Sequence, residues 1–224
     1  MDIRRALEDM TDPKNADFLS RLIPDKPRER ILGIKSPEIK RFARELSGSR
    51  DAKAFMNDLP HFYLEEDLLH AALICLEKDA DVCFEMTERF LPRIDNWAVC
   101  DSLRPRALNK NRDRLGKAAM SWLDSPLLYT RRFGIGILMS FFLTEGYSPA
   151  HAEKIASLDC GEYYLSMMVA WYFATALAKR PEDVKEYFYP GRLDESTRRR
   201  AIQKAVDSLR IPEELKAELK KIRR

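Results

Sequence analysis

Apolar residues recur at helical spacing along nearly the whole chain, and no segment shows the strict alternation that marks a half-buried strand. Helix boundaries are also signalled locally. Ser36, Pro37 and Glu38 supply an N-cap, a first-turn proline and an acid. The amphipathic segment 39–46 follows them, and Gly48 marks its end. The sequence therefore predicts an all-α protein.

The same signals divide the remaining chain into many helices joined by short connections. We expect these helices at residues 51–59, 63–77, 80–91, 96–109, 112–124, 127–143, 149–158, 162–179, 182–188, 195–209 and 212–222. Short connections make successive helices antiparallel, and a four-helix bundle would need fewer, longer helices. A pair such as 112–124 with 127–143 fits a unit of roughly 40 residues, the HEAT-like period. We therefore expect a single domain, residues 1–224, built as an α-solenoid of HEAT-like antiparallel helix pairs with a concave face.

The composition limits the partners and cofactors of the chain. The net charge is only +3, so nucleic-acid binding must come from locally clustered basic residues. The four cysteines lack CxxC spacing and the three histidines lack ligand partners, so we expect buried free thiols and no metal site. No glycine loop or catalytic triad is present, and we expect no organic cofactor. Without a signal region or a membrane-spanning run, the expected protein is cytoplasmic and does not contact membranes.

The segment Ile94–Ser102 carries the most informative pattern. In a helix, Trp97 and Asp101 are four residues apart and lie on one face. An indole and a carboxylate side by side can hold a cation, because the ring attracts it through its quadrupole and the carboxylate through its charge. Residues 104–117 follow with six basic residues against one acid. The candidate nucleic-acid contacts in that stretch are Arg104, Arg106 and Lys110. The pattern predicts chemistry on a positively charged group within a nucleic acid, with an exposed pair beside a solvated loop as the simpler alternative.

Arg131 and Arg132 form a second candidate, since arginine forks suit phosphates. Neighbouring helical residues point about 100° apart, so at most one of the two shares a face with a given ligand. Gly134 and Gly136 follow directly and predict a close helix approach. The alternative interpretation is a surface arginine pair beside a packing glycine.

Trp171 lies inside segment 163–177, which is apolar almost all round, and taken alone it reads as a core tryptophan. Lys179 follows near the end of the same predicted helix, where a cation also stabilises the helix dipole. Glu66 and His70 are four residues apart and could supply acid–base chemistry. We interpret them instead as an acidic first turn and an intrahelical pair.

Several of these segments together resemble the DNA alkylation repair enzyme family, the HEAT-like alkylpurine DNA glycosylases. In chain order the matching segments are Ile31–Pro37, Ile94–Ser102, Arg131–Gly134, Val169–Trp171 and Ala201–Lys204. The Asp-Asn-Trp-x-x-x-Asp-Ser pattern at 95–102 is the most specific, and the others support it mainly by their position. The resemblance implies a single α-solenoid whose basic concave face cups duplex DNA.

The resemblance also implies roles for individual residues. The catalytic aspartate of the family falls on Asp101, its two active-site tryptophans fall on Trp97 and Trp171, and a backbone-contacting arginine falls on Arg132. This overrides the core interpretation of Trp171. The further DNA-binding candidates are Arg131, Arg104, Arg106, Lys110 and Lys179.

The implied activity is hydrolysis of the N-glycosidic bond of N3- and N7-alkylated purines in duplex DNA. It would be carried out by a monomer without cofactor and without insertion of the base into a pocket. The chain departs from the family pattern at Leu22–Arg30, where glycosylases of this family tend to carry an aromatic residue and this chain has none. The alternative is a non-catalytic HEAT-like module that binds DNA, or a protein, with the same face.

Overall fold

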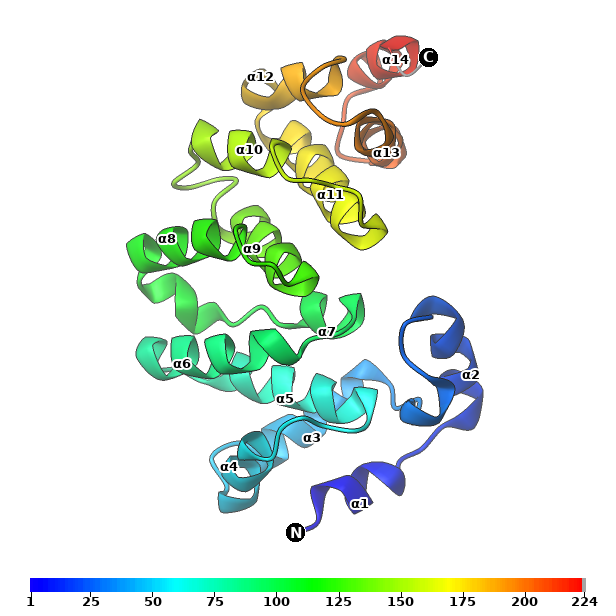
Figure 1. Cartoon of the computed structure of the whole chain (residues 1–224), viewed down its shortest axis with the longest axis vertical. Coiled ribbons are helices and arrows are strands. Elements are labelled where there is room, and N and C mark those ends of the chain that lie inside the picture. The colour runs from blue at the N-terminus through cyan, green and yellow to red at the C-terminus, as the bar shows by residue number, and fades with distance from the viewer. Residues whose placement is uncertain (223–224) are drawn as a thin grey trace. The chain divides into compact units, whose positions relative to one another are not determined.

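The computed structural model describes residues 1–222, which form α-helices, short 3-10 turns and connections without any strand (Figure 1). The all-α prediction is therefore confirmed. The chain groups into two compact units, Met1–Arg112 and Asp113–Arg224. None of the helices within residues 1–222 combines the length and the apolar character needed to cross a bilayer.

The first unit is built from helices that pack beside their next-but-one neighbours. Its α-helices are α1 (Ile3–Glu8), α2 (Pro13–Leu22), α3 (Ser36–Leu46), α4 (Arg50–Asn57), α5 (Leu64–Leu76), α6 (Ala80–Phe90) and α7 (Trp97–Ser102). Its 3-10 turns are η1 (Arg28–Arg30), η2 (Leu91–Arg93) and η3 (Arg106–Lys110). Helix α5 packs against both α3 and α7.

The second unit repeats this pattern. Its elements are α8 (Arg112–Trp122), α9 (Leu128–Phe141), α10 (Pro149–Ala156), α11 (Tyr163–Lys179), α12 (Pro181–Val184), η4 (Lys185–Phe188), α13 (Glu195–Asp207) and α14 (Glu213–Ile222). Helix α11 packs against α9 and α13. A Cβ atom on Gly134 would lie 3.0 Å from the carbonyl oxygen of Ala119, so the predicted close helix approach is confirmed there. Contacts between alternate helices are typical of stacked helix pairs.

The predicted helix over residues 96–109 was wrong. The structure ends α7 at Ser102, continues through extended backbone, and starts the 3-10 turn η3 at Arg106. Pro105 explains the break, because proline has no N–H to donate and disfavours helical backbone at the residue before it. The structure also adds α1 and α2, which the sequence interpretation did not assign, and it begins α3 at Ser36 with Lys35 as its cap.

Segment 31–37 fixes α2 to the rest of the first unit. The Glu65 carboxylate is fully buried and accepts the backbone N–H groups of Leu32 at 2.9 Å and Gly33 at 2.7 Å. Burial raises the pKa of Glu65. Gly33 has φ +85°, and a Cβ there would lie 2.2 Å from the carbonyl oxygen of Asp12. Only glycine fits this turn, because the backbone preceding α2 passes directly over it.

The acidic first turn of α5 is confirmed, but the structure gives Glu66 and His70 separate partners. Glu66 accepts the backbone N–H groups of Phe62 and Tyr63 and pairs with Arg4 at 2.9 Å. His70 Nδ1 lies 2.9 Å from His61 Nε2 in a buried contact in which one ring donates.

The two histidine rings are part of the core of the first unit. His70 stacks on Phe90 with ring centroids 4.1 Å apart, and His61 stacks on Phe55 at 4.3 Å. Burial lowers the pKa of His61, and it lowers the pKa of His70 from 6.5 to about 3. Both rings are therefore neutral in the folded protein at neutral pH.

This depressed pKa predicts acid sensitivity that depends on His70. Below pH 6.5 the unfolded chain binds a proton at His70 that the folded protein does not, so folded stability falls as the pH falls. Between pH 7 and pH 5 the loss from this residue is about 2 kcal/mol. Urea unfolding of the wild type and His70→Leu at both values measures it. An unchanged difference between the two proteins across this range would show that His70 does not titrate on unfolding.

Candidate nucleic-acid interface

Trp97 and Asp101 lie one turn apart on α7, as the sequence predicted. Asn96 caps this short helix: its side-chain oxygen accepts the N–H of Val99 at 3.0 Å. Because residues four apart share a face of a helix, the indole of Trp97 and the carboxylate of Asp101 are neighbours. Both side chains are partly exposed, and that of Asp101 is 19% exposed.

A buried lysine fixes the start of α7. Lys26 is 4% exposed, and its Nζ lies 2.9 Å from Asp95 and 3.2 Å from Asp67 on α5. Asp95 in turn accepts a hydrogen bond from the Asn96 amide at 2.8 Å. Burial raises the pKa of Asp67 to about 7, and the Lys26 ammonium opposes this rise. The residues that precede Trp97 are thus connected through one cation to α5 and to the segment after α2.

The Trp97 indole is held by the N-terminal part of the chain. Its Nε1 donates a hydrogen bond of 3.1 Å to the carbonyl oxygen of Leu22, the last residue of α2. Lys26 lies four residues beyond Leu22. The ion cluster of Lys26, Asp67 and Asp95 and the hydrogen bond from Trp97 to Leu22 therefore both attach α7 to the segment that follows α2. Segment 22–30 contains no aromatic residue, but its first residue, Leu22, accepts the hydrogen bond that positions Trp97 on α7.

Asp101 lies beside the guanidinium group of Arg104. Its Oδ1 is 3.8 Å from Arg104 Nη2, a long ion pair between two partly exposed groups. Arg104 Nη1 donates to the carbonyl oxygens of Cys100 at 2.9 Å and Leu103 at 2.7 Å. Arg104 therefore caps the C-terminal end of α7 while it adds positive charge next to Asp101.

The other two predicted cations of this stretch are exposed. Arg106 opens η3, and Lys110 closes it. Lys110 Nζ donates to the carbonyl oxygen of Lys78 at 2.6 Å, which is an uncharged acceptor at the surface. Positive charge therefore follows α7 along the chain in the first unit.

Trp171 is 43% exposed, although the rest of α11 is largely buried. The core interpretation from composition alone was wrong, and the exposure agrees with the resemblance. The indole lines a groove of about 550 Å³ between α11 and α13. Its charged lining residues are Lys179, Lys204, Arg210 and Asp207. An exposed indole among three cations and one acid suits a polyanion that carries flat or electron-poor groups.

The arginine pair of α9 is more enclosed. Arg132 is 5% exposed, and its Nη1 donates to the carbonyl oxygen of Tyr164 at 2.6 Å, at the start of α11. Arg131 is half-buried, and within residues 1–222 its Nε has no hydrogen-bond partner. One member of the pair thus joins α9 to α11, as the 100° separation of adjacent residues allows.

Sequence reasoning missed the contacts of Lys26 with Asp67 and Asp95, which hold the start of α7 in place. Asp67 and Asp95 lie 41 and 69 positions beyond Lys26, and no local pattern connects the three residues. A lysine in a Pro-Asp-Lys-Pro stretch reads as a surface residue. Arg210 was also missed, because it follows a helix end rather than a periodic face.

A model of the DNA alkylation repair enzyme family matches residues 3–162. Among curated proteins, no sequence matches the chain. The matched range contains α7, Arg131 and Arg132, whereas Trp171 and Lys179 lie beyond it. Since the match covers more than half of the 224 residues, the chain belongs to the DNA alkylation repair enzyme family.

Proposed function

We propose that this protein is a DNA glycosylase that hydrolyses the N-glycosidic bond of N3- and N7-alkylated purines in duplex DNA. The observation that carries the proposal is the indole of Trp97 and the partly exposed carboxylate of Asp101 on one turn of α7, held there by Asn96 and Lys26. Family membership supports a role in DNA repair.

The chemistry of the substrate explains why so few groups suffice. An N3- or N7-alkylated purine carries a positive charge, which weakens its glycosidic bond and lets the base leave without strong acid catalysis. Departure of the base leaves positive charge on the sugar, as in the oxocarbenium-like transition state of glycoside hydrolysis. A fixed negative group beside the sugar stabilises that charge as it forms.

Asp101 supplies this negative group in the proposed mechanism. Its carboxylate stabilises the sugar cation electrostatically and positions the water that attacks the anomeric carbon. Trp97 adds cation–π attraction of on the order of 0.5–2 kcal/mol. The hydrogen bond from its Nε1 to Leu22 fixes the plane of the ring. In the proposed mechanism the alkylated base leaves without first being inserted into a pocket.

We propose that basic side chains of each unit contact the phosphates of the DNA backbone. Lys179 is grouped with Trp171, Lys204 and Arg210 around one groove, and this grouping supports DNA contact by the second unit. In the first unit the proposed contacts are Arg104, Arg106 and Lys110. Arg131 and Arg132 are proposed as further contacts. Arg132 Nη1 would have to leave the Tyr164 carbonyl to reach a phosphate.

We also propose that the helices form a HEAT-like solenoid, and that the enzyme acts as a cytoplasmic monomer without metal or organic cofactor. The packing of α5 against α3 and α7, and of α11 against α9 and α13, supports stacked helix pairs within each unit. In such a solenoid the alternate helices line one face, which suits a long curved ligand.

The deciding experiment incubates the wild-type protein with duplex DNA that contains 7-methylguanine or 3-methyladenine and measures free base by chromatography. Release above the spontaneous rate supports the proposal. Duplex binding that weakens steeply with salt, without base release, would instead support the alternative, a non-catalytic DNA-binding module. Absence of both would leave a protein-binding solenoid.

Trp171→Ala tests the contribution of the second unit. We expect base release to fall about 10-fold, because one cation–π and stacking contact is lost. Folded stability should change by less than about 1 kcal/mol, because the side chain is exposed. Tyr163→Ala is the matched control, since Tyr163 is an exposed aromatic residue of the same helix outside this groove. Equal activities of the two variants would remove Trp171 from the proposed site.

A further inference from the structure

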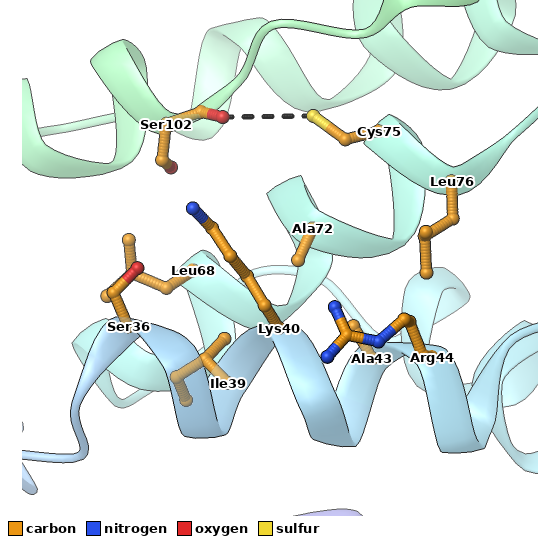
Figure 2. Close-up of a pocket in the computed structure, with 10 residues that line it drawn as sticks. All are labelled: Ser36, Ile39, Lys40, Ala43, Arg44, Leu68, Ala72, Cys75, Leu76 and Ser102. Carbon is orange, nitrogen blue, oxygen red and sulfur yellow. Dashed lines mark hydrogen bonds between the residues drawn. The ribbon is translucent and has the colours of Figure 1, made fainter.

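Helices α3 and α5 enclose a trough of about 190 Å³ in the first unit (Figure 2). Its walls are apolar and come from both helices. The wall residues are Ile39, Ala43, Leu68, Ala72 and Leu76. Cys75 and Ser102 lie at one end, where the thiol is 3.7 Å from the Ser102 carbonyl oxygen. The trough is separate from the indole and carboxylate of α7, although Ser102 belongs to that helix.

The trough exists because small residues occur where larger ones would fill it. Leu68, Ala72 and Leu76 recur every four residues along one face of α5, and Ala43 lies on the facing side of α3. An alanine on each helix leaves space between the two leucines. Empty apolar volume costs stability, since its lining atoms lose contacts, and a filled site would recover them.

Two cations lie along one edge of this apolar space. Lys40 and Arg44 are one turn apart on α3, and Figure 2 shows their charged ends extending into the gap between α3, α5 and α7. Within residues 1–222, neither forms an ion pair with a carboxylate. Arg41, on the same helix, does so with Glu45. Burial raises the pKa of Cys75, so its thiol is neutral and does not repel an anion.

We propose that this trough binds a small organic anion with an apolar body, such as an alkyl carboxylate. Lys40 and Arg44 would hold the carboxylate, and the aliphatic walls would cover the chain. Charge complementarity and the apolar lining together select this class, since a small-molecule site is mostly apolar with a few polar groups that fix orientation.

Two other occupants fit the trough less well. A docked protein needs about 800 Å² of surface on each partner, and this small trough offers only a few side chains. A DNA backbone can contact Lys40 and Arg44, but its phosphates and sugars are too polar to enter a space with aliphatic walls.

The test titrates the isotopically labelled whole protein with hexanoate and follows backbone amide signals by NMR. We expect saturable shifts along α3, α5 and Ser102, with a dissociation constant on the order of 1 mM or tighter. Hexanamide, which has the same chain without the charge, should bind at least about 10-fold more weakly. Butanoate should also bind more weakly, by about threefold to fourfold for each methylene lost.

Three variants separate this site from other uses of the same residues. Lys40→Gln with Arg44→Gln should weaken hexanoate at least about 10-fold, and Ala72→Leu should abolish binding by filling the trough. Arg41→Gln is the control and should bind normally. If the two cations serve DNA instead, the charge variant weakens duplex binding, while hexanoate does not bind even to the wild type. That result, equal binding of hexanamide, or unchanged binding by Ala72→Leu would each overturn the proposal. Base release by Ala72→Leu should equal that of the wild type, so the two functions fail independently.

Discussion

Asp101→Asn should release alkylated base from 7-methylguanine duplex at least about 100-fold more slowly than the wild type. Asparagine keeps the size of the side chain but removes its charge and replaces one acceptor oxygen by an NH2 donor. The variant therefore loses the electrostatic attraction between a fixed carboxylate and the positive charge that forms on the sugar in the transition state. Removing a single preorganised group of this kind typically costs a factor of about 100 to 1,000 in rate.

The same variant should fold and bind DNA normally. Asp101 forms a long ion pair of 3.8 Å with Arg104, and a pair between partly exposed groups contributes little to stability. Asp9→Asn is the control, because Asp9 forms a comparable 4.0 Å pair with Arg5 on an exposed surface. Single-turnover base release and duplex binding, measured on the same preparations, separate chemistry from affinity. Undiminished release by Asp101→Asn would reject the mechanism.

Lys26→Met should destabilise the folded protein by about 3 kcal/mol. The substitution keeps a long apolar side chain but removes the ammonium group that lies between Asp67 and Asp95. Asp67 is 5% exposed, and a buried carboxylate that loses its partner remains without compensation for its desolvation. Lys14→Met is the control, since Lys14 is an exposed lysine on α2 and should change stability by less than about 0.5 kcal/mol.

The pH dependence of this effect has a defined sign. Burial already raises the pKa of Asp67 from 3.8 to about 7, and removing Lys26 raises it further. A carboxyl whose folded pKa is raised makes the folded state lose stability as the pH rises above the unfolded value. The cost of Lys26→Met should therefore be larger at pH 8 than at pH 5, as measured by urea unfolding.

A double-mutant cycle separates the ion cluster from simple packing. If the penalty arises from an unpaired Asp67, adding Asp67→Asn to Lys26→Met should recover at least about 1 kcal/mol. The combined variant should also keep base release closer to the wild type than Lys26→Met alone, because the connection that holds Trp97 is less disturbed. Additive losses would show that Lys26 acts through packing.

The sequence determined the secondary structure class and the most informative residues, because both depend on local spacing. Helical periodicity, together with start signals such as Ser36, Pro37 and Glu38, predicted the helices, and the four-residue interval placed Trp97 and Asp101 on one face. Where a local rule was overlooked, as at Pro105, the predicted helix was wrong. The resemblance carried by residues 95–102 was confirmed by the family match.

Only the tertiary structure could decide what supports those residues. Lys26 is buried between Asp67 and Asp95, and Trp97 donates a hydrogen bond to Leu22, so both contacts join distant positions. The exposure of Trp171 on an apolar helix also depends on which helices pack against it. Nothing in the local sequence records them, because burial and ion pairing depend on which helices pack together. Periodicity states which face of a helix is apolar, but packing decides which apolar residue is left uncovered and which charged residue is enclosed.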